Sequence, residues 1–548
     1  MMKIKNTVLM VVLGITLSMG FTGCPTPSPI SAPSESPAAS SSDTYVSPSA
    51  QASAAAPAAS AAPSSFPSYP MPSGTPAAQG AGNVALPVQP EESKTRDNFF
   101  TNPGVNPFIS TSKDHLSTFG IDVDTASYTW MRKSLLNNFL PTKDSVRVEE
   151  YVNFFDYNYP KPEQGKFTIN TEMAKSNLDK DVTIMRVGIQ GKEIKAENRK
   201  DAVLTFVIDV SGSMNQENRL GLVKQSLAVL VNELRAADKV GIVVFGTTAR
   251  TLLEATSNKS DILRVIDSLQ PEGATNTEAG LRLGYQVAEK AFKGGAINRV
   301  ILCSDGVANS GETSADALLT KIKQESESGV TLSTVGFGMG NYNDVLMEQL
   351  ADKGDGNYAY VDNLKEAQRI FEENLTSTLQ IIAKDVKVQV DFNPGVVDSY
   401  RLIGYENRDI ADKDFRNEKV DSGEVGSNHS VTAIYHLKLK SDANVSKIAN
   451  VYLRYKDIDN LNSVMEVNKS VELKDIKANI TDSSAEFKLA VAVADYAEIL
   501  RGSTYASNHS FSDVLNLAKQ ASGSLKNDSV TEFIGLINKA NELPKINY

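Results

Sequence analysis

The chain has few of the residues that build disulfide frameworks or histidine-rich metal sites. Its 548 residues include two cysteines, four histidines and one tryptophan. Cys303 lies inside the apolar run RVILCSD, where a thiol usually behaves as a small core residue. The four histidines show no metal-ligand spacing, and a scaffold stapled by disulfides is excluded.

Features that indicate nucleic acid or nucleotide binding are also missing. The formal net charge is −11, and we find no basic stripe or interleaved aromatic platform. The stretch GFGMG at 336–340 is a strand-end turn, because the Lys-Ser or Lys-Thr of a phosphate loop does not follow it. We therefore expect no nucleic-acid partner.

The N-terminus has the pattern of an export signal. Lys3 and Lys5 precede the apolar run VLMVVLGITLSMGF, and small residues then lead into Cys24. Residues 1–23 resemble a bacterial lipoprotein signal peptide, with Phe21 where leucine is usual. The resemblance implies a lipid anchor on Cys24 and a place in the cell envelope, membrane-anchored and facing away from the cytoplasm. A plain secretory signal and an uncleaved anchor are the alternatives.

Two contrasting segments follow the signal. Residues 24–97 are rich in Pro, Ser and Ala, which predicts an extended tether because such a tract cannot bury enough apolar surface to fold. Residues 98–160 predict two helices around a turn at Pro141, from the helical spacing of their apolar residues. The stretch IDVDTA resembles a phosphatase motif, but Ala126 departs from it, so we favour helix capping by Asp122 and Asp124.

Residues 200–379 alternate short apolar strands with amphipathic helices. Strands without polar alternation, separated by helices, predict a mostly parallel sheet covered on both faces. Ligands of such sheets bind at the carboxyl ends of the strands. Asp209 and Asp305 each end a strand, and a loop containing Thr275 lies between them in sequence. Side chains that offer only oxygen predict a hard cation, with Mg²⁺ fitting best and Mn²⁺ or Ca²⁺ as alternatives.

The motifs DVSGSM, GATN and LCSDG together resemble the metal-ion-dependent adhesion site of von Willebrand factor type A domains. The resemblance implies that Asp209, Ser211, Ser213, Thr275 and Asp305 hold one divalent cation. It also implies an open coordination position that an acidic residue of a protein partner fills. A closed, purely structural metal site is the alternative.

Two neighbouring positions differ in their expected roles. Ser304 stands where many relatives have threonine, and we do not expect it to contact the metal. Thr277 is expected to cap the helix that follows it.

The remaining chain predicts a second domain. Alternating or β-branched runs occupy 380–480, and two similar runs lie in 161–199. Because a lone hairpin is marginal in water, the upstream strands should pair with the downstream ones. Residues 481–548 predict helices, with capping boxes at Ser483 to Glu486 and Ser529 to Glu532.

The arrangement as a whole is similar to the YfbK-like family of bacterial type A domain proteins. The expected fold is α/β, a doubly wound, mostly parallel sheet of the von Willebrand factor A, Rossmann-like type. A flanking antiparallel β domain and helical N- and C-terminal segments complete it.

Three functions follow from these features. A metal-dependent protein-binding or adhesion lipoprotein is favoured. An accessory or assembly subunit of an envelope complex or ATPase partner system is second, because type A domains also serve in that way. A hydrolase is third, since no nucleophile and base can be identified, and we expect the protein not to be an enzyme.

Overall fold

The computed structural model describes residues 100–306, 318, 320, 329–339, 342–420, 422–442 and 445–544. The expected signal peptide, the tether and Cys24 lie outside these residues. The described residues belong to one compact unit, Pro90–Tyr548. Among them, no helix combines the length and the apolarity that crossing a bilayer requires.

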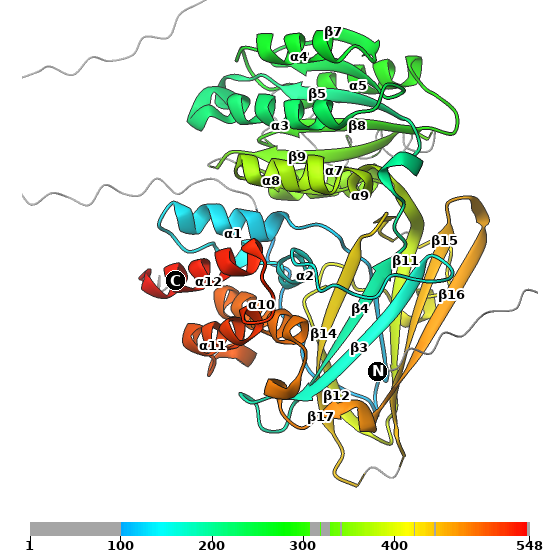
Figure 1. The fold of residues 1–548 in the computed structure, drawn as a ribbon, viewed down its shortest axis with the longest axis vertical. Coiled ribbons are helices and arrows are strands. Elements are labelled where there is room, and N and C mark those ends of the chain that lie inside the picture. Colours follow the sequence, from blue (N-terminus) through cyan, green and yellow to red (C-terminus); the bar gives the residue numbers. More distant parts are fainter. Residues whose placement is uncertain are drawn as a thin grey trace, which may run out of the picture. The chain divides into compact units, whose positions relative to one another are not determined.

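The type A segment forms a six-stranded sheet in the order β10-β9-β8-β5-β6-β7 (Figure 1). Its strands are β5 (Ala202–Asp209), β6 (Lys239–Phe245), β7 (Ala249–Thr256), β8 (Ile297–Ser304), β9 (Thr331–Phe337) and β10 (Tyr358–Val361). All neighbours pair in parallel except β7, which runs antiparallel to β6 at one edge. The strand order reverses between β5 and β8, so this is a doubly wound sheet, as predicted.

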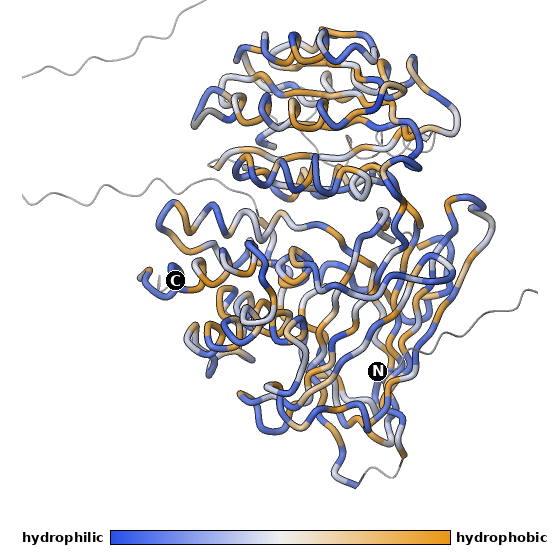
Figure 2. The backbone as a smooth tube through the Cα atoms, viewed as in Figure 1, coloured by the Kyte–Doolittle hydropathy of each residue, from blue (hydrophilic) through white to orange (hydrophobic). Residues whose placement is uncertain are grey.

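Helices cover both faces of this sheet. They are α3 (Arg219–Glu233), α4 (Lys259–Ser268), α5 (Thr277–Lys290), α7 (Asp344–Lys353), α8 (Leu364–Gln368) and α9 (Leu375–Leu379). Successive residues of β5 point to opposite faces, with Phe206 packing on the α3 side and Val207 on the α5 and α7 side. The strands β5, β6, β8 and β9 are accordingly buried and hydrophobic along most of their length (Figure 2), which is the pattern of strands covered on both faces.

Two mostly antiparallel sheets form a sandwich below the type A domain. The first has the order β1-β12-β14-β4-β3-β17, and the second joins β13, β11, β15 and β16, with β2 also paired to β11. Their bounds are β1 (Ile109–Ser110), β2 (Leu116–Gly120), β3 (Phe167–Lys175), β4 (Thr183–Gly191), β11 (Ile381–Phe392), β12 (Val397–Ile403), β13 (Val425–Gly426), β14 (Ser430–Leu439), β15 (Lys447–Asp457), β16 (Asn460–Glu472) and β17 (Ile476–Lys477). One apolar core contains residues from both sheets.

The type A domain is inserted between two strands of this sandwich. Strand β4 precedes it and pairs antiparallel with β14, which follows it in the chain. Chain entry and exit lie close together, since a Cβ on Gly191 would lie 3.0 Å from Ile382 Cδ1. The Lys200 amide also donates to Gln380 Oε1 at 3.0 Å. The sandwich is therefore discontinuous in sequence.

A third core joins helices from the two ends of the described chain. These are α1 (Ala126–Leu136), α2 (Val148–Asn153), α10 (Ala485–Arg501), α11 (Phe511–Ser522) and α12 (Asp528–Glu542). Both capping boxes predicted in the C-terminal segment are wrong. Ser484, not Ser483, caps α10, and the Ser483 hydroxyl donates to the Ile480 carbonyl. Asn527, not Ser529, caps α12.

Helix α1 also packs against the type A domain. The Trp130 ring stacks on Tyr342 with ring centroids 5.3 Å apart. Arg132 donates to both carboxylate oxygens of Asp362 at 2.7 and 2.6 Å. The flanking segment therefore holds the type A domain through an aromatic contact and a buried bidentate ion pair.

Candidate metal centre

Asp209 is the last residue of β5, a strand whose every residue is buried. The chain then leaves the sheet and turns into a 3₁₀ helix, η3 (Gly212–Asn218). The Ser211 amide donates to Asp209 Oδ1 at 2.8 Å, and the Oγ atoms of Ser211 and Ser213 lie 3.0 Å apart. These side chains are therefore brought together by a tight turn after β5, and not by alternation along one extended strand.

The loop that carries Thr275 lies against this turn. The Gly212 amide donates to the Gly273 carbonyl at 3.0 Å, and Thr275 is only 1% exposed. Gly273 has φ +67°, and a Cβ there would lie 2.2 Å from Thr247 Oγ1, so the loop requires glycine. The prediction that Thr277 caps α5 is wrong, because Asn276 accepts the hydrogen bond from the Ala279 amide.

Asp305 directly follows β8, the neighbour of β5 in the sheet. Burial raises the pKa of Asp209 to about 7, and the negative charge of Asp305 adds to the rise. The Ser304 hydroxyl donates to Asp209 Oδ2 at 2.8 Å. Ser304 therefore fixes the second oxygen of Asp209, a role that no motif marks because the two residues are 95 positions apart in the sequence.

Arg219 was missed by the sequence analysis. It is 3% exposed, and its Nη1 donates to Asp305 Oδ2 at 2.8 Å. Its Nη2 donates to the Met339 carbonyl. No motif marks this residue, because its partner lies 86 positions away in the sequence.

The donor set fits a hard divalent cation. Asp209 ends β5 and Asp305 follows the neighbouring β8 where the strand order reverses, Ser211 and Ser213 lie in the turn after Asp209, and the loop of Thr275 lies against that turn. All five side chains offer oxygen. Asp209 and Asp305 are fully buried, and Asp305 forms an ion pair with Arg219. Burial and the charge of Asp305 disfavour the ionised form of Asp209, and a bound cation would favour it.

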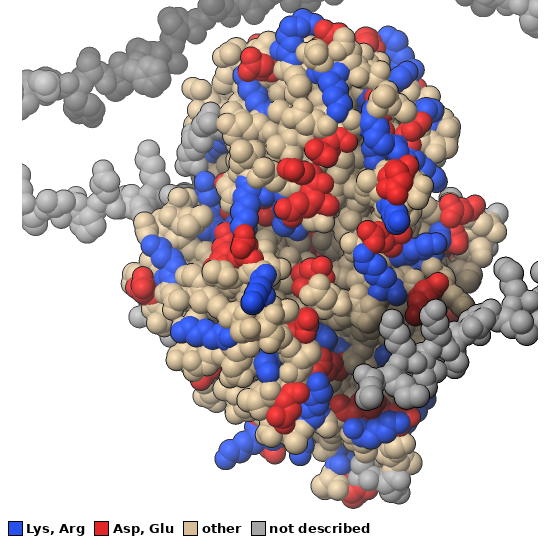
Figure 3. All heavy atoms as spheres, in the orientation of Figure 1, with Lys and Arg blue, Asp and Glu red and all other residues tan. Residues whose placement is uncertain are grey.

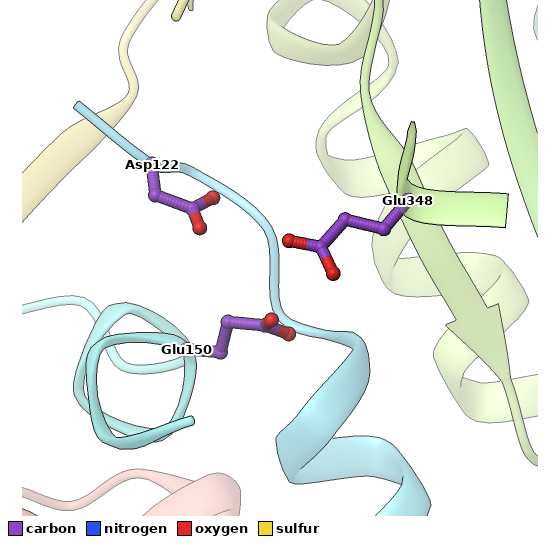
Figure 4. Close-up of side chains that lie close together, drawn as sticks. All are labelled: Asp122, Glu150 and Glu348. Carbon is purple, nitrogen blue, oxygen red and sulfur yellow. The ribbon is translucent and has the colours of Figure 1, made fainter. Parts of the chain in front are cut away.

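A second group of carboxylates lies away from the strand ends. Oxygens of Asp122, Glu150 and Glu348 lie within 4.8 Å of one another (Figure 4). They come from the loop after β2, from α2 and from α7. Burial raises the pKa of Glu150 to about 8 and that of Glu348 to about 7.

Two arginines already pair with these carboxylates. Arg147 contacts Glu150 and donates to Asp344 Oδ2 at 2.6 Å. Arg408 donates to Asp122 at 3.0 Å and to Glu348 at 3.1 Å. The group is therefore an ion-pair network that joins the flanking segments to α7, and we assign it no metal.

The network also explains why the predicted capping by Asp122 and Asp124 is wrong. Thr125 stands at the N-terminal cap of α1, and no side chain caps the helix there. Asp122 instead accepts from the Asp124 amide and from Arg408, while Asp124 accepts from the Tyr358 amide. Both carboxylates are used in contacts between segments.

A cavity of about 470 Å³ lies between β10 and the sandwich. Amide and hydroxyl side chains such as Asn357, Asn374 and Ser430 line it. None of the five predicted metal ligands does. The strand-end site is therefore separate from this cavity.

On the face drawn in Figure 3, Lys and Arg are interspersed with Asp and Glu, not gathered into one basic patch.

Comparison with known proteins identifies the segments. The von Willebrand factor type A domain matches residues 204–373, a von Willebrand factor model matches 94–186, and the C-terminal domain of uncharacterized protein YfbK matches 377–543. Uncharacterized protein YfbK of Escherichia coli (strain K12) is 36% identical over 498 residues, covering 84% of this chain and 85% of that protein.

Two further relatives share less with the chain. Inter-alpha-trypsin inhibitor heavy chain H2 of Mus musculus is 29% identical over 185 residues, which are 32% of this chain and 18% of that protein. A solved structure, von Willebrand factor type A from Catenulispora acidiphila, has 15% identity and a TM-score of 0.43, covering 70% of this chain and 91% of that one.

The two family-model matches and the identity with YfbK confirm the predicted type A domain and the predicted family. A type A domain indicates a module for protein–protein interaction or adhesion, and such domains are in general not enzymes. With its type A domain and its matching C-terminal domain, the chain belongs to the YfbK family.

Proposed function

We propose that the protein is a cell-envelope lipoprotein that binds a protein partner through a divalent cation at the type A domain. Asp209, Ser211, Ser213, Thr275 and Asp305 would hold the cation, which is Mg²⁺ or a related ion. The observation that supports the proposal is that Asp209 and Asp305 follow neighbouring strands where the sheet order reverses, with the Ser211 and Ser213 hydroxyls in the turn that follows β5.

Each of these residues would have a different role in such a site. Asp209 is fixed by Ser304 and by the Ser211 amide, so its carboxylate has one orientation. Asp305 supplies the second negative charge, and the neutral hydroxyls of Ser211, Ser213 and Thr275 add donors without adding charge. When bound, the cation supplies a Lewis-acidic position that a carboxylate oxygen of the partner can fill.

Asp209→Ala tests the metal site. We expect saturable binding of Mg²⁺ and Mn²⁺ by the native chain in calorimetric titration, and loss of that binding in the variant. Circular dichroism should be unchanged, because the site lies at the strand ends, outside the apolar core. Glu254→Ala is the matched control, since that carboxylate belongs to the same sheet and is 60% exposed.

Partner capture then tests the mechanism. Envelope extracts passed over the immobilised native protein with Mg²⁺ should yield a partner that is absent with EDTA and absent with Asp209→Ala. A partner retained equally under all three conditions would show that recognition uses another surface.

The location is part of the same proposal and is supported by the signal-like sequence up to Cys24. Cys24→Ser should abolish the lipid mass on the mature N-terminus and release the protein from the membrane fraction. Unchanged fractionation of this variant, with no lipid found on the native protein, would contradict the anchor.

A further inference from the structure

Arg219 begins α3 and places its guanidinium directly behind Asp305. The group bridges Asp305 Oδ2, at 2.8 Å, and the Met339 carbonyl. It also fills the space over Gly338, where a Cβ would come within 2.2 Å of Arg219 Nε. Gly338 has φ +83°, so glycine suits this position for conformation as well as for space.

This placement leaves Asp305 with one oxygen committed to an ion pair. A guanidinium holds a fixed fork of donors, which suits two acceptors in different directions better than an ammonium does. The carboxylate is therefore oriented before any cation arrives, with Oδ2 turned toward Arg219.

The positive charge of Arg219 has a second effect, on the net charge of the site. Asp209 and Asp305 carry two negative charges, and Arg219 returns one positive charge in the same buried region. A divalent cation added to this set leaves one positive charge in excess. Without Arg219, the loaded site would be neutral and would attract a carboxylate less strongly.

We propose that Arg219 determines the specificity of the site, weakening its hold on the cation while giving the loaded site the positive charge that selects an anionic ligand. This inference rests on the proposed metal-dependent function. It assigns Arg219 as a positioning residue, because it acts through Asp305.

Arg219→Gln should shift two affinities in opposite directions. We expect Mn²⁺ to bind about tenfold more tightly, because a neighbouring positive charge has been removed. Acetate, used as a carboxylate probe, should bind the Mn²⁺-loaded protein about tenfold more weakly. Calorimetry gives the first affinity, and the loss of water proton relaxation as acetate displaces metal-bound water gives the second.

Arg219→Lys separates charge from shape. It keeps the positive charge, so both affinities should stay within about threefold of the native values. Arg264→Gln is the control for charge lost elsewhere in the domain, since that arginine side chain is 72% exposed, and it should change neither affinity. Thermal unfolding in EDTA shows that each variant is folded.

The outcomes separate this inference from the proposed function. If Arg219→Gln changes neither affinity, or lowers both, while the native protein binds Mn²⁺, the role of Arg219 is overturned and the metal site stands. A lysine variant that behaves like the glutamine variant would also overturn it, because packing would then explain the effect. If the native protein does not bind Mn²⁺, both the inference and the proposed function fail.

Discussion

His509 is held between two carboxylates that come from different elements. Its Nε2 lies 3.2 Å from Asp179 Oδ2, and its Nδ1 lies 3.6 Å from Asp495 Oδ1 on α10. The side chain is only 3% exposed. The nearby carboxylate of Asp495 is the main reason that the pKa of His509 rises to about 9, and Asp179 adds to the rise.

This raised pKa predicts a loss of stability at alkaline pH. Because the folded-state pKa exceeds the unfolded value of about 6.5, the contribution is complete below pH 6.5 and is lost as the pH rises through 9. We expect His509→Gln to remove about 1 to 2 kcal/mol at pH 6 and almost nothing above pH 9.5. Urea unfolding of both proteins across this range measures the difference.

The comparison with the variant is needed because Glu150 and Glu348 titrate in the same range. Their contribution is common to both proteins and cancels in the difference. His115→Gln is the matched control, since its ion pair with Asp391 is exposed. An equal loss of unfolding free energy in His509→Gln and His115→Gln would contradict a specific contribution from the buried contacts of His509 with Asp179 and Asp495.

The residues of the candidate site differ in whether a sequence motif can identify them. The five predicted ligands could be named because the type A motif fixes their spacing within short stretches of sequence. Ser304 and Arg219 could not, because each acts by contacting a residue far away in the chain. Their roles follow from the pairing of β5 with β8 and from the packing of α3.

At the scale of elements, α2 and α7 are joined by a buried arginine. Arg147 immediately precedes α2, and its guanidinium reaches Asp344 at the start of α7. Asn343, which caps α7, also lies against Gly306, where a Cβ would meet its carbonyl oxygen at 2.8 Å. The residue after Asp305 therefore touches the helix that the flanking segment holds.

Arg147→Gln should destabilise the whole unit. It leaves the buried carboxylate of Asp344 without its paired cation, and breaking one partner of such a pair costs about 3 to 5 kcal/mol. Chemical unfolding at pH 7.5 measures the loss. The Arg147→Gln, Asp344→Asn double variant should recover part of the loss, whereas a single-variant effect below about 1 kcal/mol would contradict the network.

Element prediction succeeded where a pattern is long. Strands β5, β6, β8 and β9 are nearly continuous apolar runs, and the helices α1, α3, α5 and α10 show the apolar periodicity that their packing requires. Strands β1 and β10 were not predicted, since they have two and four residues and owe their form to pairing with β12 and β9. The helix caps were wrong because nearby polar residues compete for the same amides.

At the scale of the molecule, the type A domain is inserted in the sequence of a β sandwich, and sandwich strands from before and after the insertion pair with each other. The pairing of β4 with β14 follows from the weakness of an isolated hairpin, so a sequence argument can reach it. The contact between the flanking segments and α7 could not be anticipated. It depends on arginines and carboxylates that carry no periodic signal.

The stacking of Trp130 on Tyr342 has a further consequence. The chain has no other tryptophan, so its tryptophan fluorescence comes from one place. Asn137, on the same helical segment, donates to the sulfur of Met339, whose carbonyl accepts from Arg219. The emission of Trp130 therefore reports, without an added dye, whether a structural change beside Asp305 reaches the interface between the type A domain and α1.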